Sequence, residues 1–150
     1  METRETLLEQ LNETISRLID VAKNIPDPDF AVYKEWSIKE VLGHITFWHE
    51  SFARNVSDLV QNIRPKPLKG RYGELNQRCM EEIKTQSVED IIRRLEAAQQ
   101  VIRDNILNPN LSIIPYKVGS RSYTPEEHLN LVVKHIQGHI RDIQKSIAQK

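Results

Sequence analysis

The sequence predicts an all-α domain built as a four-helix bundle. Four segments of roughly 20 residues carry apolar residues at helical spacing, and no segment alternates convincingly between apolar and polar residues. Prolines and glycines separate the helical segments. The 150 residues are enough to bury one core and too few for two substantial ones, so we expect residues 1–150 to form a single domain.

The first two helices are predicted by their apolar stripes and by the residues at their ends. The first stripe begins at Leu7 and stops near Asn24, before two prolines. The second helix starts at Ser37, which can cap the free backbone amides and has a glutamate three residues further on. Its stripe continues to Ile63. Residues 64–72 contain two prolines and a glycine, so we expect a loop there.

Three further helical segments follow in the second half of the chain. A short stretch covers residues 74–84, and a long helix, again with a capping serine and an acidic third position, covers 87–107. Residues 108–123 have no clear period and are expected to be irregular. The last helix, over 124–148, begins with a capping threonine, a proline at the first position and a glutamate at the third.

Composition and charge exclude several classes of function. Lys plus Arg and Asp plus Glu each number 21, so no overall field attracts nucleic acid or anionic lipid. No apolar run approaches the roughly 18 to 20 residues of a membrane span. The single Cys79 rules out an intramolecular disulfide framework, and the first residues lack the pattern of a signal peptide. We expect a soluble, cytoplasmic protein that acts on a small molecule, without nucleic acid or membrane.

All five histidines lie on two of the predicted helices, the second and the last. His135 and His139 are four residues apart, which places two imidazoles on one face at the separation that one metal ion needs. At about 100° per residue, His128 shares their flank of the apolar stripe. On the second helix, His44 lies at the flank and His49 nearer the apolar centre. Flank positions can converge in an open cleft, which favours His44 as the third ligand without excluding His49.

Other readings of this pattern are weaker or less specific. Two histidines four residues apart also occur by chance in an amphipathic helix. The residues between His135 and His139 include no carboxylate, so a metalloprotease of the HExxH kind is unsupported. No pair of helices offers two ExxH motifs, which argues against a di-iron carboxylate bundle.

Two short motifs resemble those of the DinB-like (DinB/YfiT) superfamily of metal-dependent bundle proteins. Residues 36–44 (WSIKEVLGH) resemble its second-helix motif, and residues 135–140 (HIQGHI) resemble the histidine pair of its last helix. The resemblance covers most of the chain. It implies one divalent ion (nickel, zinc or iron) bound by His44, His135 and His139. It also implies an up-down-down-up bundle with a long crossover between the second and third long helices.

The resemblance implies several activities. Family members include thiol S-transferases that use low-molecular-weight thiols and a mycothiol-dependent maleylpyruvate isomerase. We therefore expect a thiol S-transferase or hydrolase in which the metal activates a thiol or water against a small electrophile, with a low-molecular-weight thiol as a second cofactor. A non-catalytic metal-binding or stress-response protein is the alternative, and we expect a homodimer. A third interpretation assigns the histidine face to a subunit interface.

Further residues are candidates for the surroundings of the metal. His49 and His128 are candidate catalytic proton carriers because imidazole titrates near neutrality, with packing roles as the alternative. Asp142 lies three residues after His139 and is a candidate second-shell acceptor. Three aromatic side chains suit the wall of an apolar pocket and are candidate cofactor-binding residues: Trp36, Trp48 and Tyr123. Asn76 is a fourth candidate, because the resemblance places its amide near the site.

Overall fold

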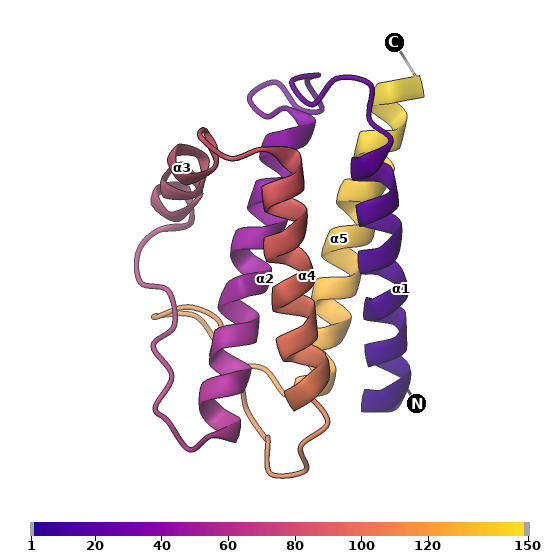
Figure 1. The fold of residues 1–150 in the computed structure, drawn as a ribbon. Helices are drawn as coiled ribbons and strands as arrows, with labels where there is room; N and C mark the ends of the chain where they lie inside the picture. The colour runs from indigo at the N-terminus through magenta and orange to yellow at the C-terminus, as the bar shows by residue number, and fades with distance from the viewer. Residues whose placement is uncertain (1, 149–150) are drawn as a thin grey trace.

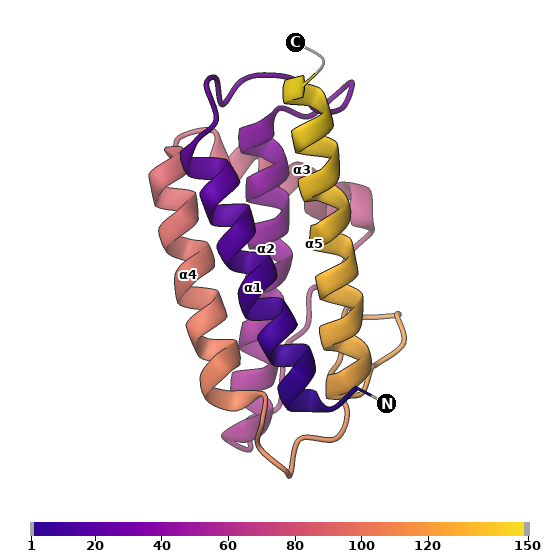
Figure 2. The ribbon, with the colours of Figure 1, turned by 90° about the vertical axis from the view of Figure 1, so that its right-hand side faces the viewer.

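The computed structural model describes residues 2–148, which form five helices (Figure 1): α1 (Arg4–Lys23), α2 (Ile38–Val60), α3 (Tyr72–Ile83), α4 (Val88–Asn105) and α5 (Pro125–Ala148). Within these residues the only β-structure consists of isolated bridges, so the all-α prediction is confirmed. Helices α1 and α5 run in one direction, and α2 and α4 run in the other (Figures 1 and 2). No helix of residues 2–148 is long and apolar enough to cross a membrane.

The predicted helix starts have the predicted caps. Ser37, Ser87 and Thr124 each accept, at the side-chain oxygen, a hydrogen bond from the backbone N–H three residues further on. The acidic side chain at that third position accepts a hydrogen bond in return from the N–H of the capping residue. Each of these reciprocal pairs satisfies two backbone donors that the first turn of a helix leaves free, and so fixes where α2, α4 and α5 begin.

Three predicted helix boundaries are wrong by two or three residues. Helix α4 ends at Asn105 rather than at residue 107. Helix α2 ends at Val60 rather than at Ile63, because the chain reverses at Asn62, whose φ of 60° lies in the left-handed region that asparagine tolerates. Ile63 is consequently exposed. Helix α3 begins at Tyr72, which we had placed in the loop, and so is slightly longer than its predicted range.

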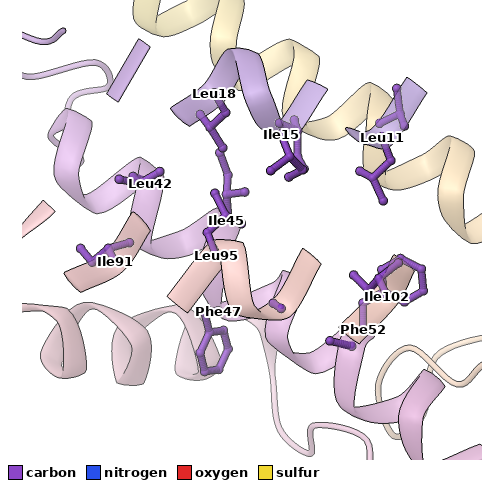
Figure 3. Packing of buried hydrophobic residues seen from close by; sticks show 14 of the residues in the cluster. Leu11, Ile15, Leu18, Leu42, Ile45, Phe47, Phe52, Ile91, Leu95 and Ile102 are labelled. Carbon is purple, nitrogen blue, oxygen red and sulfur yellow. The ribbon is translucent and has the colours of Figure 1, made fainter. Parts of the chain in front are cut away.

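The hydrophobic core lies between the four long helices. Helix α2 packs mainly against α4, and α1 mainly against α5. Leu18 of α1, Ile45 of α2 and Leu95 of α4 point toward one another in this core (Figure 3). Helix α2 is buried along most of its length, and its buried residues include polar ones such as His44 and His49. Buried polar groups need partners, so the partners of these two histidines define what each can do.

The short helix α3 lies outside the four long helices and packs against α2 (Figure 1). The contact is made at Gly43, where an added Cβ would lie 2.5 Å from Cδ1 and 2.9 Å from Cγ2 of the buried Ile83. The thiol of Cys79, also buried, donates a hydrogen bond to the carbonyl oxygen of Gly43. This close approach brings Asn76 of α3 within hydrogen-bond distance of His44.

Residues 106–124 connect α4 to α5 and cover the beginning of α5. Ile114 and Tyr123 exchange two backbone hydrogen bonds of 2.7 and 2.9 Å, which close the connection on itself. The backbone N–H of Val118 donates to the carbonyl oxygen of Leu68 and so joins this connection to the loop before α3. The arrangement sets Tyr116 and Tyr123 against the first turn of α5.

Candidate metal centre

Three histidines from α2 and α5 converge as the sequence predicts. One ring nitrogen of each of His44, His135 and His139 lies within 4.8 Å of the others, and no other such group of three occurs in residues 2–148. The Nε2 atoms of His135 and His139 are 3.0 Å apart. The ring of His44 is buried, that of His139 is half-buried and that of His135 is exposed, so the cluster has one closed and one open side.

The orientation of His44 is fixed by a shared hydrogen-bond acceptor on α3. The indole N–H of Trp48 donates to Oδ1 of Asn76 over 3.0 Å, and Nδ1 of His44 lies 3.2 Å from the same oxygen. An indole N–H can only donate, so the atom that it reaches must be the amide oxygen. His44 therefore carries its proton on Nδ1, and its Nε2 keeps a free lone pair. Trp36 packs against the same imidazole, with ring centroids 4.7 Å apart.

The orientation of His139 is fixed by a tyrosine that the sequence analysis did not identify. The hydroxyl of Tyr33 lies 2.9 Å from Nδ1 of His139 and donates its single proton to a carboxylate oxygen of Asp142. The phenol oxygen is therefore left to accept a proton from Nδ1 of His139. Burial, and then the carboxylate of Asp142, raise the pKa of Tyr33, which stays protonated at neutral pH. His139 thus also presents Nε2 as a lone-pair donor.

All three imidazoles of the cluster are neutral at pH 7. Burial, and then the two neighbouring imidazoles, lower the pKa of His44 to about 4. Burial and His135 lower the pKa of His139 to about 4. Burial also lowers the pKa of His135. Neutral imidazole is the form that binds metals, so no proton has to be removed from these rings at neutral pH.

This donor set fits a divalent transition-metal ion. Imidazole nitrogen suits zinc, nickel and iron alike. Two imidazole nitrogens on a tetrahedral ion lie about 3.4 Å apart, given metal–nitrogen bonds of about 2.1 Å. The separation of 3.0 Å between His135 and His139 is close to this value, and the 4.8 Å limit for the whole group requires only a small closing movement. The residues that would hold an ion are thus already close together. At Nδ1, His44 and His139 also have the hydrogen-bond partner that metal-bound histidines commonly have.

The two candidate proton carriers, His49 and His128, do not join this cluster. Both are buried, and both line a cavity of about 260 Å³ that His135 also lines. Nε2 of His49 lies 2.7 Å from Oε1 of Gln99, whose amide nitrogen donates in turn to Asn12. Burial lowers the pKa of His49 and of His128 to about 4 in each case.

His128 differs from the expectation that its flank position leaves it accessible. It is only 1% exposed, although the nearby His135 on the same helix is exposed. The reason is the connection between α4 and α5, which places Tyr116 and Tyr123 at 5.6 and 5.8 Å from the ring of His128. Tyr123, a candidate cofactor-binding residue, contacts the rings of His128 and Tyr116, and neither of these contacts involves the three clustered histidines.

The fold and the site together define a helical bundle with a three-histidine centre, and the chain belongs to the DinB superfamily. The family model described as the DinB superfamily matches residues 10–143. No curated protein matches the chain.

Solved structures are similar to the chain in fold. A mycothiol-dependent maleylpyruvate isomerase has a TM-score of 0.75 and 11% identity over 95% of this chain and 61% of its own. A mutant of that isomerase has a TM-score of 0.74 and 10% identity over the same shares. An uncharacterised protein from Escherichia coli UTI89 has a TM-score of 0.76 and 13% identity over 99% of this chain and 95% of its own. The chain thus spans about three fifths of the length of the isomerase.

Proposed function

We propose that this protein is a metal-dependent enzyme that activates a thiol or a water molecule against a small electrophile. On an up-down-down-up bundle, His44, His135 and His139 hold one divalent ion. The observation that carries the proposal is the convergence of these three imidazoles within 4.8 Å. It is supported by the hydrogen bonds that hold the proton of His44 and of His139 on Nδ1, so that Nε2 of each ring carries the lone pair.

The residues around the cluster have different roles in such a metal centre. A divalent ion bound by three imidazoles keeps open coordination positions and lowers the pKa of a bound water or thiol. Asn76 and Tyr33 orient two of the imidazoles through Nδ1. Trp36 covers His44 on the buried side, and the exposed His135 marks the side from which a substrate approaches.

Thiol transfer is the first reaction to test, with hydrolysis second. Its support is the similarity in fold to an enzyme whose name states a dependence on mycothiol. We propose a small molecule as the substrate, since a formal net charge of zero gives the protein no overall attraction for nucleic acid. The compartment we propose is the cytoplasm.

The experiment measures thiol consumption by protein purified without an affinity tag. The protein is loaded with zinc, nickel or iron and mixed with glutathione, bacillithiol or mycothiol and a panel of alkyl halides and epoxides. We expect metal-dependent turnover that His44→Ala and His135→Ala abolish. Lys134→Ala, which replaces an exposed side chain next to His135, serves as the matched control and retains turnover.

Two other outcomes have definite meanings. If the wild-type protein binds one ion per chain but consumes no thiol and hydrolyses no member of the panel, the enzymatic proposal is contradicted and the non-catalytic metal-binding alternative is supported. If His44→Ala and His135→Ala leave the metal content unchanged, the ligand assignment is wrong.

A further inference from the structure

A cavity of about 260 Å³ lies beside His135, between α2, α5 and the connection that precedes α5. An apolar cavity of roughly 150 Å³ accepts a benzene molecule, so this one has room for a substituted aromatic ring. Trp48 and Tyr116 form a flat part of its wall, their rings stacked 5.4 Å apart with an interplanar angle of 7°. Leu131 and His135 are exposed, so the lining includes residues that solvent reaches.

No side chain that lines this cavity carries a formal charge at neutral pH. The lining contains no aspartate, glutamate, lysine or arginine. Burial holds the pKa of both buried histidines of the lining, His49 and His128, at about 4. Burial also raises the pKa of Tyr116 to about 12, so its phenol stays protonated. In the metal-free protein, a charged ligand would lose its hydration here without gaining a counter-ion, which disfavours it strongly.

Two of the histidines that line the cavity each have a buried ring nitrogen without a hydrogen-bond partner within residues 2–148. Within residues 2–148, His128 makes no side-chain hydrogen bond, and its buried Nδ1 has no partner. The ring cannot easily turn to find one, because it is stacked on Phe52 with centroids 3.8 Å apart and an interplanar angle of 10°.

The second unsatisfied group is Nδ1 of His49, which is also buried and unpartnered in the part of the chain that the structure describes. Its Nε2 donates to Oε1 of Gln99, because the amide nitrogen of Gln99 is committed to Oδ1 of Asn12. Nδ1 of His49 is therefore a hydrogen-bond acceptor. Burying unpaired polar atoms costs free energy, and a ligand with a matching polar group relieves that cost.

We infer that this cavity binds an uncharged aromatic ring of the substrate and that a hydroxyl group on the ring pairs with the imidazole of His128. A neutral imidazole has one donor and one acceptor nitrogen, and a hydroxyl group can serve as either partner. The inference deepens the proposed function, on which it rests, because the cavity and the metal centre share His135. It assigns the substrate of that centre to the neutral phenolic or hydroxyaryl class.

The test uses three small probes of similar size and different polarity: phenol, toluene and benzoate. Each is titrated into the full-length protein, with and without zinc, while the side-chain resonances of His128 and His49 are followed by NMR. We expect saturable shifts with phenol and with toluene, and none with benzoate in the metal-free protein, where no ion beside His135 can pair with the carboxylate. The shifts are expected in both metal states, since the lining is formed by the chain itself.

Substitutions then test the role of His128 and the location of the binding. His128→Phe keeps a ring against Phe52 and removes both nitrogens, so the ratio of phenol affinity to toluene affinity should fall about tenfold. Val132→Phe fills the cavity and should abolish binding of both probes. Val101→Phe makes the same change at a half-buried valine on α4, outside this cavity, and should leave both affinities unchanged.

The outcomes separate this inference from the proposed function. Absence of saturable binding by phenol and toluene overturns the inference, as does benzoate binding as tightly as phenol to the metal-free protein. An unchanged affinity ratio in His128→Phe overturns the pairing with His128. If the rings bind as expected while zinc does not bind to the wild-type protein, the inference stands as a ligand site and the proposed metal function fails. If zinc binds to the wild-type protein while phenol and toluene do not, the aromatic ligand site is ruled out and the proposed metal function stands.

Discussion

The five histidines form two groups on the same two helices, and the groups differ in how their nitrogens are used. His49 follows His44 by five residues and His128 precedes His135 by seven, which corresponds to about 7.5 and 10.5 Å along the helix axes. Because α2 and α5 run in opposite directions, both displacements lead toward the same end of the bundle (Figure 1). His49 and His128 thus lie nearer to that end than the cluster of His44, His135 and His139 does.

The comparison shows that burial and neutrality alone do not make a histidine a ligand. The pKa of His44 and that of His49 are each lowered to about 4, chiefly by burial. In the cluster, an acceptor holds the protonated Nδ1 of His44 and of His139, and one nitrogen of each of the three rings lies within 4.8 Å of the others. In the second group, the unpartnered nitrogens of His49 and His128 belong to separate rings that form no such cluster. The position of the hydrogen-bond partner therefore separates the two roles.

The largest expected effect distinguishes a ligand from a lining residue. His139→Ala should lower zinc affinity by more than about a hundredfold, since loss of a mere second-shell partner already costs about 10 to 100-fold. His49→Phe should change it by less than about twofold, because His49 is outside the cluster. Competition with a chromophoric chelator measures both. Equal losses of zinc affinity in the two variants would show that the two groups of histidines do not differ in metal binding.

The next effect concerns acid stability. The pKa of His128 is about 4 in the folded protein, against 6.5 for an ordinary histidine. Between these values the unfolded chain binds a proton that the folded chain does not, so stability present above pH 6.5 is lost as the pH falls toward 4. The loss from this one group is roughly 3 kcal/mol.

His128→Phe should therefore lose less stability than the wild type between pH 7 and pH 4, by about that amount. Urea unfolding of metal-free protein at the two pH values measures the difference. An identical loss in both proteins would show that His128 is not buried in its neutral form.

A smaller effect is expected for the residue that orients His139. Tyr33→Phe removes the phenol oxygen that accepts from Nδ1 of His139 and should weaken zinc binding by about tenfold. Tyr72→Phe removes a hydroxyl from an exposed tyrosine and should leave zinc affinity unchanged. The same chelator competition applies. Unaltered affinity in Tyr33→Phe would mean that the hydrogen bond does not orient the ligand.

The smallest expected effect on zinc affinity comes from a change at the contact that positions α3. Gly43→Ala introduces a Cβ that would lie 2.5 Å from Cδ1 of Ile83, so the Ile83 side chain or α3 as a whole must shift. Overpacking of this kind costs about 1 to 3 kcal/mol, to be measured by urea unfolding at pH 7. Zinc affinity should fall by a few-fold at most, since Asn76 shifts with α3 but remains next to His44. A gain in stability would show that α3 adapts without strain.

The sequence predicted the helices and the ligand cluster for identifiable reasons. Apolar stripes and capping residues are local signals, and they located all five helices to within a few residues. The spacing of His135 and His139 is also local. The positions around α2 favoured His44 over His49 without excluding His49, and the family resemblance decided the choice. The structure brings His44 to the pair, while His49 bonds to Gln99.

The surroundings of the cluster could not be predicted in the same way. Tyr33 lies in an irregular segment, and its contact with His139 spans 106 positions of the chain, so no spacing rule identifies it. The burial of His128 depends on how residues 106–124 fold over α5, which their sequence pattern does not reveal. Asn76 was expected only from the family resemblance, and its position depends on the close packing at Gly43.

The most direct test of the central claim is X-ray absorption spectroscopy at the zinc edge of protein loaded with one equivalent of zinc. The account predicts three imidazole nitrogens at about 2.0 to 2.1 Å, with the remaining coordination made by light atoms from solvent. A spectrum with fewer than three imidazoles, or with sulfur from Cys79, would contradict it.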